Sequence, residues 1–139
     1  MIKEIVSDEE FLSLPAEIAT AEDAEVAQDL IDTINSMEDC ACLAANMIGS
    51  RKAVIVYQDD KDENHIMYNP RIKFGKRSYK STEGCFSLQR DSNVTRYQTI
   101  RVTYQELVDG ELVNRDDEFT EWTAQAIQHA IDHCRGRLV

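Results

Sequence analysis

Residues 120–136, which read TEWTAQAIQHAIDHCRG, decide the fold of this chain. The apolar and polar positions predict a helix from Glu121 to Cys134. Thr120 is a suitable N-cap residue, and an acidic residue at position 121 suits the positive end of the helix dipole. Gly136 suits the position just past the last turn, where a left-handed backbone is common.

His129 and His133 are four residues apart on this helix. Both imidazoles therefore lie on one helix face, one turn apart, and two of their nitrogens can converge on one metal ion. The pattern alone is more often an ordinary polar helix face. The remaining histidine, His65, stands beside an expected strand without such a partner, and we interpret it as structural.

A metal ion held by two histidines needs another protein ligand, and a thiolate is a suitable one. Cys85 lies in the segment Glu83-Gly84-Cys85-Phe86-Ser87, where the glycine lets the backbone turn or approach closely. A second candidate is the segment 40–47, which reads CACLAANM. Each cysteine taken alone also fits the role of a small buried apolar residue.

Helix and strand patterns recur along the rest of the chain. A helix is expected at about 22–37, where Thr20 and Asp23 resemble a capping box. Asn69-Pro70 indicates a turn or strand edge, and Asp109-Gly110 predicts a type I′ hairpin turn. Strands are expected at residues 53–57, 65–68, 71–74 and 94–104, and residues 106–113 are expected to form a hairpin around the Asp109-Gly110 turn. Helix, several antiparallel strands and helix in this order predict an α+β fold with antiparallel or mixed sheets.

The composition limits the classes of function. With 139 residues and 15.9 kDa, the chain suits one domain spanning 1–139. Its 26 acidic and 15 basic residues give a net charge of -11, which argues against nucleic acid or an anionic membrane as the main partner. The acidic N-terminus lacks the apolar core of a signal peptide, so we expect a reducing cytoplasm. Four irregularly spaced cysteines do not form a disulfide framework there.

Three segments, taken in order, resemble the motifs of the peptide deformylase family. The family's GxGLAAxQ is matched by Cys40–Met47, with Cys40 and Cys42 in place of its two glycines. Its EGCLS is matched by Glu83–Ser87 and its HExxH by His129–His133. The resemblance extends over essentially the whole chain. It implies β-sheets around a C-terminal metal-binding helix, as in peptide deformylases.

The resemblance also implies an activity, which is removal of the N-formyl group from the initiator methionine of nascent peptides. Cys85, His129 and His133 would hold one divalent metal ion, with a fourth position open to water. Ferrous iron is the expected native ion, and nickel, cobalt and zinc also suit this site. Association with the ribosome is compatible with this substrate but is not predicted by the residues.

Further roles follow from the same resemblance. The backbone amide of Cys85 would stabilise the oxyanion. Glu83 would orient groups near the ligands, although an ordinary salt-bridged strand residue is the alternative. Core packing is the alternative that we prefer for Trp122. The residues assigned to substrate binding are Cys42, Leu43, Phe86, Trp122, Gln125 and Ala126.

Two catalytic positions depart from the family pattern. Met47 replaces a glutamine that donates to the reacting oxygen, and a thioether cannot donate. Ala130 replaces the glutamate that transfers the proton, which is typically worth about 10²–10⁴ in rate. Ala130 is either a natural divergence or a deliberate substitution that silences an active enzyme. The intact ligand set favours the second explanation. Asp132 has a structural role instead, holding an imidazole or pairing with Arg96 or Arg135.

Three functions therefore compete. The first is a deformylase whose turnover is impaired by Ala130, and the second is a non-catalytic binder of N-formyl-methionyl peptides. The third is a closed structural zinc site with a fourth ligand such as Cys42 or Cys134. Cys134 directly follows His133 on the helix, so it points about 100° away and is a poor fourth ligand.

Overall fold

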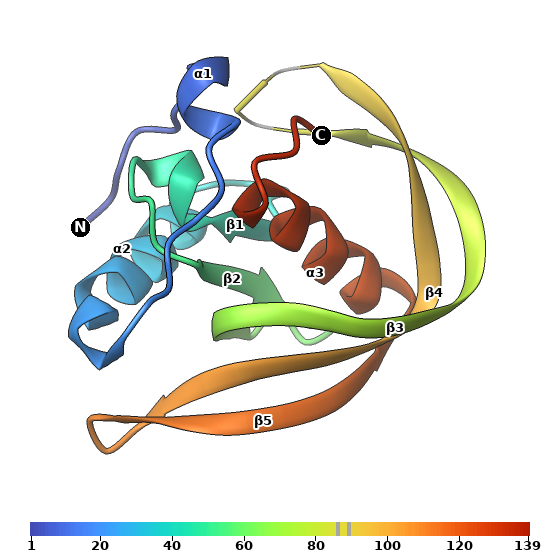
Figure 1. The fold of residues 1–139 in the computed structure, drawn as a ribbon. Coiled ribbons are helices and arrows are strands. Elements are labelled where there is room, and N and C mark those ends of the chain that lie inside the picture. Colours follow the sequence, from blue (N-terminus) through green and yellow to red (C-terminus); the bar gives the residue numbers. More distant parts are fainter. Residues whose placement is uncertain (86, 89) are drawn as a thin grey trace.

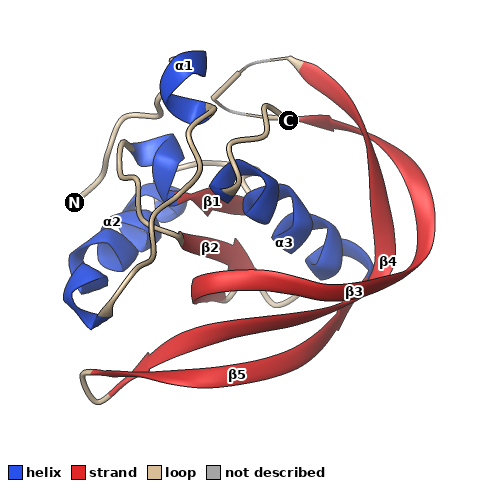
Figure 2. Cartoon of the chain, in the orientation of Figure 1, coloured by secondary structure: helices blue, strands red, loops and turns tan. Residues whose placement is uncertain are grey.

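A computed structural model of the chain describes residues 1–85, 87–88 and 90–139. One antiparallel sheet in the strand order β1-β2-β3-β4-β5 forms its framework (Figures 1 and 2). The strands are β1 (Cys42–Ala44), β2 (Val54–Gln58), β3 (Asn64–Gly84), β4 (Asp91–Val108) and β5 (Glu111–Thr120). The helices are α1 (Glu9–Leu12), α2 (Ala24–Asn35) and α3 (Glu121–Cys134), with short 3₁₀ helices η1 (Ala21–Asp23) and η2 (Ala45–Ile48). The α+β prediction is confirmed.

The C-terminal helix α3 lies at the centre of the molecule. It packs against β1, β2 and β4, and the long β3–β4 hairpin curves around it (Figure 1). Ile127 and Ile131 of α3 are fully or almost fully buried, together with Val54 and Val56 of β2. Four consecutive residues of β2 are buried because both α2 and α3 pack against this strand. This packing fixes the helix that carries both histidines.

Several local predictions are confirmed. The last helix has the predicted bounds, and Gly136 beyond it has a φ of 77°. Asp109 and Gly110 both have positive φ, as a type I′ turn between β4 and β5 requires. Thr20 and Asp23 form the predicted capping box, although it opens η1 rather than α2 directly. Thr120 has an extended backbone, but its side chain makes no capping hydrogen bond.

The prediction of a break at Asn69-Pro70 is wrong. A single strand, β3, runs through this dipeptide, and its pairing with β4 shifts register between Tyr68 and Arg71. Asn69 has a φ of 52°. Its side-chain oxygen accepts from the Ala19 amide at 2.8 Å, and its side-chain nitrogen donates to the Ala19 carbonyl at 2.9 Å. Asn69 is therefore a bulge that ties the sheet to the segment before α2.

Some elements were not predicted at all. These include β1, α1 and the second half of β3, where exposed polar residues alternate with partly buried ones. Within the described residues, none of the helices has the length and apolarity that a membrane crossing needs.

Candidate metal centre and pocket

Two elements bring three ligand atoms together. Helix α3 carries His129 and His133, and Cys85 directly follows the end of β3. The Nε2 atom of His133 lies 3.3 Å from the Cys85 sulfur and 3.2 Å from Nε2 of His129. The ligand atoms of all three residues lie within 4.8 Å of one another. The residues that the sequence proposed as metal ligands therefore share one site.

Glu83 fixes the orientation of the His129 ring. One of its carboxylate oxygens lies 2.8 Å from Nδ1 of His129, so the other ring nitrogen faces Cys85 and His133. Gln125, one turn before His129 on α3, donates to the other carboxylate oxygen at 2.8 Å. The sequence placed Gln125 near this face but gave no sign of its contact with Glu83.

A buried ion-pair network supports this carboxylate. Arg96 of β4 donates from Nε and Nη2 to Glu83, with a shortest distance of 2.7 Å. The same guanidinium donates from Nη1 to Asp132 of α3 at 2.5 Å. Arg96 is 3% exposed, so the two carboxylates balance a charge that water hardly reaches. Asp132 thus pairs with Arg96, one of the two partners that the sequence suggested, and its second partner is Arg137.

The ligand side chains perturb one another electrostatically. Burial alone would raise the pKa of Cys85, but hydrogen bonds from both histidines lower it to about 5. Burial would lower the pKa of His129, but hydrogen bonds with Cys85 and Glu83 raise it to about 9. Despite burial, hydrogen bonds from His129, Arg96 and Gln125 lower the pKa of the Glu83 carboxyl. The environment therefore favours the Cys85 thiolate, which is the form that binds metal.

The donor set fits a divalent metal ion. One thiolate and two imidazoles suit zinc or ferrous iron. Among the described residues, the cluster of possible ligands around Cys85 contains only these three side chains, and Cys134 is not one of them. Three protein ligands with an open position are typical of catalytic rather than structural sites. This count argues against the closed structural zinc site.

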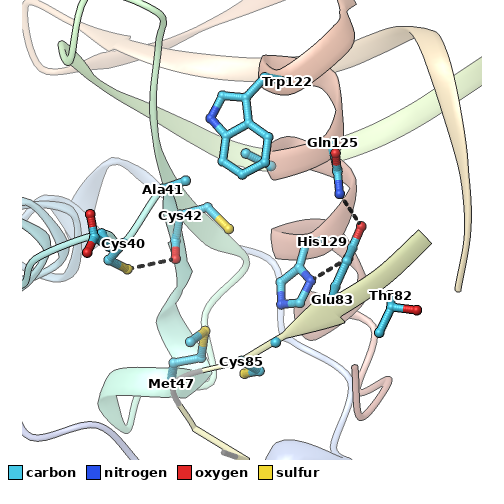
Figure 3. A pocket seen from close by; sticks show the side chains of 13 residues that line it. Cys40, Ala41, Cys42, Met47, Thr82, Glu83, Cys85, Trp122, Gln125 and His129 are labelled. Atoms are coloured by element: carbon cyan, nitrogen blue, oxygen red, sulfur yellow. Dashed lines mark hydrogen bonds and ion pairs between the residues drawn. The ribbon is translucent and has the colours of Figure 1, made fainter. Parts of the chain in front are cut away.

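A pocket of about 260 Å³ opens directly beside the cluster (Figure 3). It extends from Cys85 and His129 to the edge strand β1 and the first turns of α3. Its lining is mostly apolar or sulfur-containing. The lining residues are Asp39, Cys40, Ala41, Cys42, Met47, Thr82, Glu83, Gly84, Cys85, Trp122, Gln125, Ala126 and His129.

The structure places the proposed substrate-binding residues differently. Cys42, Trp122, Gln125 and Ala126 line the pocket, whereas Leu43 does not line it and is fully buried in the core. Phe86 lies outside the described residues. Our preferred interpretation of Trp122 as a core residue is wrong, because this side chain is 60% exposed at the pocket.

The two positions that depart from the motifs have different surroundings. Ala130 is fully buried in the apolar core and is not among the residues that line the pocket. Met47 lines the pocket, and its sulfur accepts from the Ala44 amide at 3.4 Å. Neither side chain can donate a proton to a molecule in the pocket.

The outer edge of β1 also faces the pocket. Gln58 of β2 donates to the Ala41 carbonyl at 2.9 Å, so the backbone groups of Cys42 point away from β2. The Cys40 thiol donates to the Cys42 carbonyl at 3.4 Å. Burial raises the pKa of Cys40 to about 11, which keeps this thiol protonated. The outward-facing carbonyl of Cys42 is therefore paired with a thiol, which is a weaker donor than a backbone amide.

The chain is similar to peptide deformylases in both sequence and structure. A family model described as polypeptide deformylase matches residues 3–139. A peptide deformylase of Clostridium beijerinckii is 41% identical over 142 residues, covering 100% of both chains. Peptide deformylase 3 of Shewanella oneidensis is 32% identical, covering 79% of this chain and 68% of its own. A class I type b peptide deformylase structure from Acinetobacter baumannii, with K1U bound, gives a TM-score of 0.85 at 22% identity, covering 99% of this chain and 97% of its own. A Legionella pneumophila peptide deformylase structure gives 0.84 at 25% identity, covering 99% and 83%.

Proposed function

The chain belongs to the polypeptide deformylase family, as its three motifs predicted, and from this premise we propose that it acts on N-formyl-methionyl nascent peptides as a metal-dependent hydrolase. The products are formate and a peptide with a free amino terminus, and the proposed location is the cytoplasm. The observation that carries the proposal is the convergence of Cys85, His129 and His133 beside a pocket that Cys85 and His129 themselves line.

In this proposal, Cys85, His129 and His133 hold one divalent ion, natively ferrous iron, with nickel, cobalt or zinc as substitutes. When bound, the ion supplies an electrophile for the formyl oxygen and acidifies a water molecule. Glu83 keeps Nδ1 of His129 engaged at 2.8 Å, which leaves Nε2 available as the ligand atom. Arg96 in turn prevents the Glu83 carboxylate from turning away.

The peptide binds in an extended form along the outer edge of β1. Its backbone replaces the weak thiol contact on the Cys42 carbonyl with an amide hydrogen bond. The methionine side chain enters the pocket between Cys42, Trp122 and Ala126. Sulfur-containing and aromatic surroundings suit a polarisable thioether. The backbone amide of Cys85 donates to the developing oxyanion, while Met47 adds no donor there.

Proton transfer is the step for which this site offers no free acid–base side chain among the described residues. Ala130 cannot accept a proton from water or pass one to the leaving amine. Glu83 lines the pocket, but Arg96, His129 and Gln125 already occupy its carboxylate and lower its pKa. We therefore expect turnover to be about 10²–10⁴-fold slower than with a positioned acid–base group.

The deciding experiment restores that group with Ala130→Glu. The Cβ of residue 130 points towards the preceding helical turn, where Ala126 lines the pocket, so a longer side chain at this position extends in the direction of the pocket. Formate release from N-formyl-Met-Ala is measured for both proteins, loaded anaerobically with ferrous iron or with nickel. We expect a rise of about 10²–10⁴-fold in the variant, reflecting acid–base catalysis.

Ala130→Gln is the matched control, because it has the length of glutamate but cannot shuttle a proton. It should bind metal and remain as slow as the original chain. Absence of formate release in Ala130→Glu, with the metal bound and the fold intact, would contradict the deformylase proposal.

A non-catalytic binder of N-formyl-methionyl peptides is the second candidate function. Its support is the burial of Ala130 in the apolar core, together with the engagement of the Glu83 carboxylate by three partners. Calorimetry with N-formyl-Met-Ala and with unformylated Met-Ala distinguishes the two candidates. A binder would prefer the formylated peptide but release no formate, even as Ala130→Glu.

A further inference from the structure

The His133 ring lacks one hydrogen bond. Its Nε2 atom faces Cys85 and His129, so it is the ligand atom of the proposed metal site. A neutral imidazole that ligates through Nε2 carries its proton on Nδ1. The ring is 0% exposed, and no described residue pairs with Nδ1. His129 differs, because Glu83 holds its Nδ1 atom.

Asn46 of η2 has a side-chain oxygen for which the described part of the chain supplies no hydrogen-bond donor. Its side-chain nitrogen donates to the backbone carbonyl of His133 at 2.8 Å and approaches that of Leu12 at 3.4 Å. Its side-chain oxygen is buried and has no partner among the described residues, and the residue is only 5% exposed. An unpaired acceptor and an unpaired donor therefore belong to two residues that a hydrogen bond already joins. Buried polar groups are rarely left unpaired in proteins.

We propose that Asn46 is a positioning residue for His133, a role that rests on the metal site proposed above. Its Oδ1 atom accepts the Nδ1–H bond of His133, directly or through one buried water molecule, and so presents Nε2 to the metal ion. The amide then holds the residue at two points, the backbone carbonyl and the ring. Position 46 is the variable x of the GxGLAAxQ pattern, so the motif assigns no role to this asparagine.

Ser87 is the competing acceptor, because its hydroxyl oxygen is also buried without a partner. It lies two residues beyond Cys85 in the chain, but no hydrogen bond joins it to His133 among the described residues. The observed bond from Asn46 to the His133 carbonyl favours the asparagine. Parallel substitution of both residues separates the two possibilities.

The test uses the full chain loaded with Zn²⁺. Zinc affinity is measured by competition with a chelator, and the Nδ1–H signal of His133 is followed by ¹⁵N NMR. Asn46→Leu should weaken zinc binding by about 10–100-fold and expose that proton to rapid exchange. Asn46→Asp loses both donor bonds but keeps an acceptor, so it should retain zinc affinity within a few-fold. Ser87→Ala should leave both readouts unchanged.

Asn69→Gly is the stability control, because it removes an amide bonded to the Ala19 backbone and to Gln105, away from the ligands. It should lower the unfolding temperature without changing zinc affinity. The proposal would be overturned if Asn46→Leu bound zinc as tightly as the unsubstituted chain and kept the Nδ1–H of His133 protected from exchange. Equal losses in the leucine and aspartate variants would also overturn it, because they would assign the effect to the donor bonds. Failure of the unsubstituted chain to bind zinc would instead contradict the metal site itself.

Discussion

Replacing Glu83 by glutamine tests whether one buried carboxylate supports both the fold and the metal centre. The change preserves the size of the side chain but removes its charge. The carboxylate accepts from Arg96 at 2.7 Å and from Gln125 at 2.8 Å, and it holds Nδ1 of His129 at 2.8 Å. An amide offers one acceptor oxygen and directs an NH₂ group towards groups that are themselves donors.

The expected loss of stability follows from the burial of the network. Glu83 is 8% exposed and Arg96 is 3% exposed, so water compensates little for the lost charge. Removing one partner of a buried ion pair typically costs about 3–5 kcal/mol. Here Asp132 still balances part of the Arg96 charge, and the amide keeps one acceptor. We therefore expect the free energy of unfolding to fall by about 2–4 kcal/mol, somewhat less than that typical cost.

Urea unfolding of the metal-free proteins measures this loss at pH 7. The folded-state pKa of Glu83 lies below its ordinary value of 4.5, so its stabilisation is complete above that pH. The difference between the two proteins should therefore shrink as the pH falls below about 4.5. Zinc affinity should fall about 10–100-fold, because His129 loses its orienting partner.

The matched control is Glu106→Gln, which removes a carboxylate 3.0 Å from Arg115 at the surface, where both side chains are 42–50% exposed. It should cost less than about 1 kcal/mol. A loss in Glu83→Gln as small as that of the control, with unchanged zinc affinity, would refute the reasoning.

Three shorter predictions concern the pocket and its ligands. Adding Met47→Gln to Ala130→Glu supplies an oxyanion donor and should raise kcat by roughly 10²-fold; an unchanged kcat would show that residue 47 does not reach the reacting oxygen. Trp122→Ala should raise KM for N-formyl-Met-Ala while changing the unfolding free energy by less than about 0.5 kcal/mol, since the side chain is 60% exposed. In the metal-free protein, iodoacetamide at pH 6 should alkylate Cys85, whose pKa is about 5, and spare Cys134, whose pKa burial raises to about 12. Mass spectrometry would identify the alkylated residue, and bound zinc should protect Cys85.

Local patterns in the sequence determined the elements that carry the chemistry. The bounds of α3 followed from its apolar periodicity and from Gly136, and the β4–β5 turn followed from Asp109-Gly110. Both depend on the conformations of a few neighbouring residues, so no distant contact is needed to predict them. The i, i+4 spacing of the two histidines likewise fixes their common face through helix geometry alone.

Tertiary structure decided what surrounds that helix. The second half of β3 has a polar sequence that resembles a loop, yet it is a strand because β4 supplies a partner for its backbone groups. Glu83, Arg96 and Asp132 come from three elements, and only the packing of α3 inside the β3–β4 hairpin brings them together. The contacts of Asn46 and the exposure of Trp122 could not be predicted for the same reason. Burial and hydrogen-bond partners depend on which segments meet in space, and no short-range rule in the sequence specifies that meeting.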